Sequence, residues 1–261
     1  MASSSAWLEQ YHKYYDAATG MPEYYAKDSA FVDDAIKQVL KFTVSATSSG
    51  AVKGDIIIQY GINLAVLFPA CRYFKEITHV ALIETNRQAA KKWANNETGA
   101  FDFSEAAQFV CELEGHSETW TEKEEMMRRK MTQFLKCEAE EGRLVLPSLL
   151  TKADCILVVH FLEMICPSLD VFCKAVKDMS CQLNIGGHLL LNVLLGGTFI
   201  IIGTFKFPLL CLDEERVNRA ISEAGLVIEK SKNNPRANTC QYSVTDFTSA
   251  LCVLARKERD V

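Results

Sequence analysis

The sequence has no excess of basic residues, no low-complexity tract and no internal repeat. Lysine and arginine together number 28, against 33 aspartate and glutamate residues, which gives a net charge of -5. Binding of nucleic acid through its phosphates needs clustered positive charge, so we expect no nucleic-acid partner. The content of 49% hydrophobic and 23% charged residues is typical of a globular protein and excludes disorder, collagen and coiled coil for most of the chain.

The 10 cysteines include no C-x-x-C pair. The chain has 261 residues, which is too long for a small scaffold held by disulfides, and residues 1–7 lack a basic start followed by an apolar segment. We therefore expect reduced, mostly buried cysteines in a cytoplasmic protein. No spacing of histidine, cysteine and acidic residues indicates a metal site.

Long apolar runs are also scarce. Residues 189–205 carry no charge, but a membrane helix needs about 20 such residues. The pair Gly196-Gly197 and the β-branched residues 200–202 favour a strand, a turn and a second strand here, so we do not expect a membrane span.

Short apolar runs alternate with amphipathic segments from residue 53 onward. This alternation predicts an α/β fold with a mostly parallel sheet of seven strands, flanked by helices. Strands are expected at residues 55–58, 79–83, 107–113, 153–159, 188–191, 226–229 and 250–256. Helices are expected at residues 28–43, 86–93, 121–136, 169–183 and 213–224.

The chain divides by composition near residue 50. We expect residues 1–50 to form an N-terminal helical cap and linker, and residues 51–261 to form one compact α/β domain. Aromatic side chains are dense in residues 1–27, and such an arm usually packs onto a body or covers a pocket. Residues 45–50 have linker composition, and Thr121 with Glu124 is expected to form a capping box at the start of a helix.

Eight short stretches together resemble one known family. In order they are Val52–Asp55, Ala70-Cys71 with Phe74–Ile77, Ala100–Ser104, Lys136-Cys137, Ala153–Cys155, Ile185–Gly187, Glu223–Gly225 and Leu254–Lys257. With this order and spacing, the chain resembles the nicotinamide, phenylethanolamine and indolethylamine N-methyltransferases over about residues 20–257. The resemblance implies the Rossmann-like class I fold of S-adenosylmethionine-dependent methyltransferases. It also implies methyl transfer to an amine or pyridine nitrogen.

The resemblance implies a cofactor site at the carboxyl ends of the first two strands. The family's loop there reads Asp-Ile-Gly-Ser-Gly-Pro-Thr. This chain has Gln-Tyr-Gly-Ile-Asn-Leu-Ala at residues 59–65, and its loop is two residues shorter. Gln59 replaces the acid, Asn63 replaces the second glycine, and Gly61 alone is kept. The family's ribose-binding acid falls on Ala81.

The family's contact residues can be matched one by one. The positions that match cofactor contacts are Tyr25, Gly61, Asn63, Asn86 and Glu138. On the substrate side, the family's acid falls on Val193, a serine on Gly197 and a pocket tyrosine on Ile200. Because these replacements carry no polar group, the matching leaves no catalytic residue to name.

Two hypotheses follow from these replacements. Losing two hydrogen bonds to carboxylates weakens binding by roughly 3–6 kcal/mol, which is about a hundredfold to ten-thousandfold. The first hypothesis is therefore a pseudoenzyme that needs no cofactor and binds an apolar small molecule or a second copy of itself. The alternative is an active S-adenosylmethionine-dependent N-methyltransferase with a rearranged loop, in which Glu84 supplies the missing acid. His160 and His188 are interpreted as hydrogen-bonded structural residues rather than as a base or metal ligands.

Overall fold

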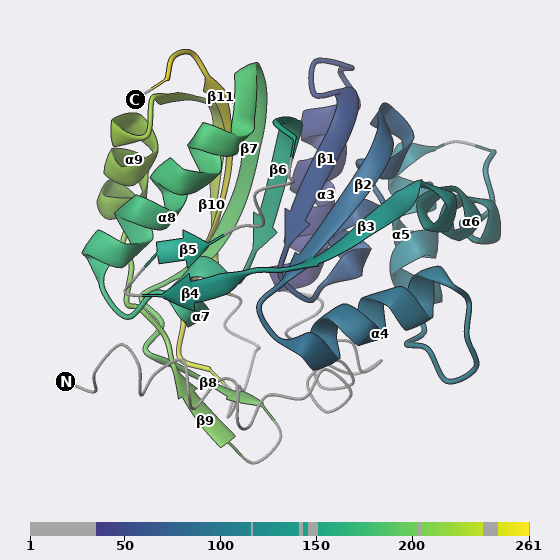
Figure 1. The fold of residues 1–261 in the computed structure, drawn as a ribbon, viewed down its shortest axis with the longest axis horizontal. Coiled ribbons are helices and arrows are strands. Elements are labelled where there is room, and N and C mark those ends of the chain that lie inside the picture. The colour runs from purple at the N-terminus through teal and green to yellow at the C-terminus, as the bar shows by residue number, and fades with distance from the viewer. Residues whose placement is uncertain are drawn as a thin grey trace.

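The protein is built around one mostly parallel seven-stranded sheet (Figure 1). The computed structural model describes residues 35–115, 117–140, 143–145, 151–202, 205–236 and 245–260. The strand order is β10-β11-β7-β6-β1-β2-β3. The strands of this sheet are β1 (Gly54–Tyr60), β2 (Phe74–Ala81), β3 (Met131–Lys136), β6 (Ala153–Val159), β7 (Leu183–Leu195), β10 (Leu226–Pro235) and β11 (Ser249–Lys257).

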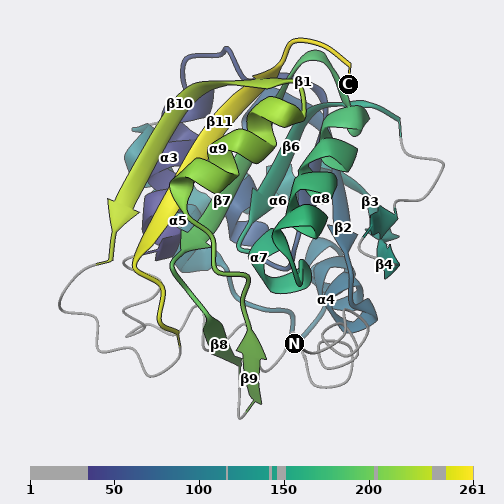
Figure 2. The same ribbon diagram turned by 90° about the vertical axis from the view of Figure 1, so that its left-hand side faces the viewer.

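Helices cover both faces of this sheet. They are α3 (Lys37–Thr47), α4 (Glu84–Ala94), α5 (Ser104–Glu114), α6 (Trp120–Lys130), α7 (Leu162–Ile165), α8 (Leu169–Gln182) and α9 (Glu214–Glu223). Figure 2 shows α8 and α9 on one face, with α3 on the opposite face. Two 3-10 helices, η2 (Leu64–Leu67) and η3 (Cys71–Tyr73), follow β1, and two small hairpins are formed by β4 (Glu138–Glu140) with β5 (Arg143–Val145) and by β8 (Phe199–Ile202) with β9 (Phe205–Pro208).

The order in which the chain places its strands in the sheet changes direction between β1 and β6. The pairs β1–β2, β2–β3, β1–β6 and β6–β7 are parallel, whereas β11 is antiparallel to both β7 and β10. The strands β2 and β3 lie on one side of β1, and β6 and β7 lie on the other. In open parallel sheets of this kind, ligands bind outside the carboxyl ends of the strands at such a reversal.

The central strands are apolar because helices bury both of their faces. Ile57 and Ile58 in β1 are fully buried, as are Ile156 and Val158 in β6. These strands confirm the predictions for residues 55–58 and 153–159. The uncharged segment predicted as two strands also has that form, because β7 ends at Leu195 and β8 begins at Phe199.

The strand predicted at residues 107–113 was wrong, because this segment forms the helix α5. Asp102 Oδ1 accepts a hydrogen bond from the Ser104 amide at its start, and Gly115 ends it with a left-handed φ of 65°. Ala107 and Val110 are both buried. Their spacing of three residues is typical of a helix. The high local density of apolar residues in the sequence nevertheless favoured the prediction of a strand.

The helix predicted at residues 121–136 was half wrong. The helix α6 ends at Lys130, and residues 131–136 form the edge strand β3, the seventh strand of the sheet. The capping box is made by Thr119 and Glu122 rather than by Thr121 and Glu124. The sequence carries the same Thr-x-x-Glu pattern twice, two residues apart, so the pattern alone did not fix the register.

Residues 45–47, assigned to a linker, are helical in α3. This helix packs against β10, β11 and η2. The tyrosine-rich arm lies outside the described residues, and the division of the chain at residue 50 stays a prediction.

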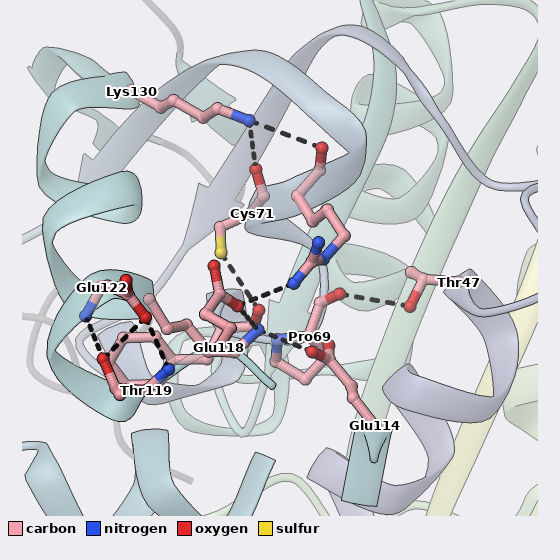
Figure 3. A network of polar contacts seen from close by, with 11 residues as sticks. Thr47, Pro69, Cys71, Glu114, Glu118, Thr119, Glu122 and Lys130 are labelled. Carbon is pink, nitrogen blue, oxygen red and sulfur yellow. Dashed lines mark hydrogen bonds and ion pairs between the residues drawn. The ribbon is translucent and has the colours of Figure 1, made fainter. Parts of the chain in front are cut away.

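A buried ionic network joins α5 and α6 to the segment after η2 (Figure 3). The side chain of Lys123 is fully buried, and its Nζ lies 2.7 Å from Glu114 Oε2 and 3.1 Å from Glu118 Oε2. Arg72 adds a second cation at 2.8 Å from Glu118. Removing one member would leave an uncompensated buried charge, which is strongly destabilising.

Three further observations concern the described residues alone. All nine of their cysteines are free thiols. No helix among them combines the length and the apolar character that crossing a bilayer requires. In the same ranges, no group of three histidine, cysteine or acidic side chains is placed to hold a metal ion.

Candidate functional site

A pocket lies at the carboxyl ends of β1, β2 and β6, where the sheet reverses direction. It encloses about 610 Å³, including space open to solvent. Its walls come from the loops after these strands and from the starts of α3 and α4. The lining residues are Ile36, Gly61, Ile62, Asn63, Ala81, Leu82, Ile83, Asn86, Val159, His160, Phe161, Met164 and Ile165.

The loop after β1 places Gly61 and Asn63 in this lining. Gly61 has a φ of 109°, a backbone conformation that residues with a Cβ atom rarely adopt. Its amide donates to the Val80 carbonyl at 3.2 Å. Asn63 has an extended backbone with a φ of -84°, so it does not copy a glycine turn. Its Oδ1 accepts from the Ala65 amide at 3.0 Å and caps η2. Both residues therefore shape the pocket through the backbone.

Gln59, which stands at the family's acid position, is engaged below the pocket. Its side chain is fully buried, and its Oε1 lies 2.6 Å from Nδ1 of His79, which is its register partner on β2. Burial lowers the pKa of His79 to about 3, so the ring is neutral and its Nδ1–H donates to the amide oxygen. Gln59 also donates from Nε2 to the Tyr60 carbonyl at 3.0 Å. The residue is thus held in the core, and it is not part of the pocket lining.

The end of β2 gives the pocket the methyl group of Ala81, and the start of α4 gives it the amide of Asn86. Ala81, the position of the family's ribose-binding acid, lines the pocket and is 1% exposed. Asn86 lines it from the first turn of α4 and is 6% exposed. Its Oδ1 is buried and accepts no hydrogen bond in the structure. The pocket therefore has a neutral, unsatisfied polar group close to the position where the family has a charge.

The acids that matched the family lie elsewhere. Glu84 is bound by the Arg87 guanidinium and by Gln88 Nε2, and these hydrogen bonds, led by that from Arg87, lower its pKa to about 2. Glu138 lies 3.4 Å from Lys136 Nζ on the exposed surface. Neither side chain lines the pocket. Tyr25 lies outside the described residues.

The residues matched to the family's substrate side are packed into the core. Val193 is fully buried in β7, and Ile200 is 3% exposed in β8, where it forms a β-bridge with Thr245. A Cβ on Gly197 would lie 3.3 Å from Leu209 Cδ1. None of the three lines the pocket. Their role in substrate binding stays a prediction.

The pairing of β6 with β7 places the two histidines apart, because His188 lies opposite Cys155 whereas His160 follows the last residue of β6. His160 follows β6, lines the pocket and has an unusual positive φ of 47°. Its amide donates to the Asn192 carbonyl, and burial lowers the pKa of its ring to about 4. His188 lies opposite Cys155 and is 3.2 Å from Glu229 Oε2. The structure does not bring them together.

One acid near the pocket was missed by the sequence reasoning. Glu163 lies in the segment of residues 159–165 that supplies much of the lining, although its own side chain does not line the pocket. It is fully buried, its Oε1 accepts from the Leu194 amide at 3.0 Å, and its Oε2 has no donor. Burial raises its pKa to about 7. The signal in the sequence was a lone acid inside the apolar run at residues 161–165.

The fold and the place of the pocket define a class I S-adenosylmethionine-dependent methyltransferase fold. The comparisons then identify the family. The model of the NNMT/PNMT/TEMT family matches residues 5–258, so the chain belongs to this family.

The relatives by sequence are N-methyltransferases by name. The chain is 32% identical to indolethylamine N-methyltransferase of Oryctolagus cuniculus over 258 residues, with 96% of each chain covered. It is 35% identical to nicotinamide N-methyltransferase of Sus scrofa over 234 residues, with 88% of each covered.

Solved structures confirm the fold at low sequence identity. Magnesium protoporphyrin IX methyltransferase from Synechocystis PCC 6803, with bound S-adenosylmethionine, superposes with a TM-score of 0.59. It is 11% identical, and the match covers 99% of this chain and 98% of that one. A second methyltransferase, from Leishmania major, gives a TM-score of 0.60 at 10% identity, with 97% and 82% covered.

The described part of the pocket does not fit the cofactor that this family implies. S-adenosylmethionine presents a positively charged sulfur and a ribose with two neighbouring hydroxyl groups. An acid usually accepts from such hydroxyls at the end of the second strand, where this chain has the methyl group of Ala81. No charged side chain is among the described residues that line the pocket. The polar side chains there, Asn63, Asn86 and His160, are neutral at pH 7.

Proposed function

We propose that this member of the family binds a small, neutral, largely apolar molecule in the pocket and no longer holds S-adenosylmethionine for methyl transfer. The observation that carries the proposal is the loss of both acids from the cofactor position. Ala81 gives the pocket a methyl group, and Gln59 is engaged with His79 in the core. A concave, largely apolar lining with a few polar groups is typical of small-molecule sites.

The size of the effect supports this proposal. A hydrogen bond from a neutral donor to a carboxylate is worth roughly 1.5–3 kcal/mol. The loss of one such bond at Ala81 weakens binding about tenfold to a hundredfold, and the second loss multiplies that factor. Glu84 does not compensate, because Arg87 and Gln88 already bind its carboxylate.

A second candidate is methyl transfer from S-adenosylmethionine to a nitrogen of a small molecule. The sequence comparisons favour it over the first candidate, because the relatives over most of the chain are named N-methyltransferases. The buried carboxyl group of Glu163, whose Oε2 has no donor, lies in the segment next to the pocket without lining it.

A substitution that restores the charge separates the two candidates. We would titrate S-adenosylhomocysteine into the wild type and into the Ala81→Asp and Ala81→Asn variants by calorimetry. Asparagine has the shape of aspartate without its charge, so it is the matched control. The first candidate predicts a dissociation constant above about 1 mM for the wild type and for Ala81→Asn, and one lower by about tenfold or more for Ala81→Asp. Tight binding to the wild type contradicts it.

We further propose that the protein acts in the cytoplasm and has no nucleic-acid partner. Self-association is the other partner that the apolar sequence features favour. Sedimentation of the purified chain at several concentrations tests it, because a dimer predicts a mass that rises with concentration.

A further inference from the structure

The amide of Asn86 is a polar group of the pocket lining whose oxygen has no hydrogen-bond partner. The residue is 6% exposed, lies on the first turn of α4 and lines the pocket. Its Oδ1 is buried without a hydrogen bond. Burying an amide without partners is unfavourable, and such groups are rare in folded proteins. Asn86 therefore indicates a ligand group that completes its hydrogen bonding.

The other polar side chains of the described lining are those of Asn63 and His160. Asn63 Oδ1 accepts from the Ala65 amide, and this bond sets the start of η2. The ring of His160 forms a hydrogen bond with the Asn192 side chain, whereas its Nε2 makes none. The rest of the described lining is glycine and apolar side chains. A ligand therefore meets a largely apolar wall in which the amide of Asn86 is available for pairing.

We propose that the ligand is a neutral molecule with an apolar body and one hydroxyl group, and that this hydroxyl pairs with the amide of Asn86. A hydroxyl both donates and accepts, so it satisfies either end of the amide. A charged ligand would lose its hydration without gaining a partner of opposite charge. The inference rests on the proposed function, because it names the ligand class of the same pocket.

Two probes of nearly equal shape test the hydroxyl. These are para-fluorophenol and para-difluorobenzene, which differ by a hydroxyl group in place of a fluorine atom. Fluorine NMR titration of the full chain follows both directly. We expect para-fluorophenol to bind about tenfold more tightly, which is the effect of one hydrogen bond made to an otherwise unpaired group. Equal affinities, or no binding of either probe, overturn the inference.

Variants show whether the preference comes from this amide. Asn86→Leu is expected to bring the ratio of the two affinities close to one, and Asn86→Ala is the second variant if leucine prevents folding. Thr85→Leu is the matched control, because Thr85 is the exposed neighbour on the same helix. It is expected to keep the preference. A preference that survives in the folded Asn86 variants overturns the assignment.

The two proposals fail in different measurements. The affinity for S-adenosylhomocysteine tests whether the pocket has lost its cofactor. The affinity ratio of the two probes tests the ligand class. A chain that binds S-adenosylhomocysteine and also prefers para-fluorophenol refutes the loss of the cofactor and leaves the hydroxyl assignment standing. A chain that binds neither S-adenosylhomocysteine nor para-fluorophenol refutes the hydroxyl assignment and leaves the loss of the cofactor standing.

Discussion

Replacing Asn86 by leucine should stabilise the protein when no ligand is present. The amide is buried and makes no hydrogen bond, so its removal avoids a desolvation penalty of about 1–3 kcal/mol. Leucine is also the better helix former by a few tenths of a kcal/mol, and position 86 lies in α4. We therefore expect the free energy of unfolding to rise by about 1–3 kcal/mol, measured by urea denaturation at pH 7.

A matched substitution at another buried asparagine is expected to act in the opposite direction. Asn192 in β7 also has a buried Oδ1 without a partner, but its Nδ2 donates to the Leu251 carbonyl at 3.1 Å and contacts Cys252 Sγ. Asn192→Leu removes these bonds and should destabilise the protein by about 1 kcal/mol. If Asn86→Leu also destabilises the protein, the amide of Asn86 has a partner and the reasoning is refuted.

Two further substitutions test the buried charges. Lys123→Met leaves Glu114 and Glu118 without their shared cation and should lower the free energy of unfolding by about 3–5 kcal/mol; a loss below about 1 kcal/mol in denaturant titration would show that the network is not intact. Glu163→Gln tests the raised pKa of about 7. Because the folded state holds this proton more tightly than the unfolded state, the wild type loses stability as pH rises from about 4.5 through 7. The variant should therefore match the wild type near pH 4 and exceed it by up to about 3 kcal/mol above pH 8, and a difference independent of pH in thermal unfolding would show that Glu163 is not the titrating group.

The central strands of the fold could be predicted because burial on both faces leaves an unambiguous run of apolar residues. The edge of the sheet could not. Residues 131–136 in β3 are half-exposed and alternate poorly, so they were merged with the helix before them. The helix α5 was mistaken for a strand because its apolar residues are adjacent in sequence as well as three apart. Local pattern does not settle such segments, because the neighbours that pack on them decide their structure.

The candidate site was predicted in part. Gly61, Asn63 and Asn86 line one pocket, and their role in cofactor binding stays a prediction. The pairing of Gln59 with His79 depends on strand register, and the burial of Glu163 depends on how α7 packs against β7. Neither relation can be read from one sequence, because each joins residues that only the sheet brings together.

The most direct test of the account is the affinity of the wild-type chain for S-adenosylmethionine, measured by calorimetry together with S-adenosylhomocysteine. The lining without carboxylates predicts a dissociation constant above about 1 mM for both. Saturable binding of either molecule below about 100 µM, with one site per chain, would contradict the account.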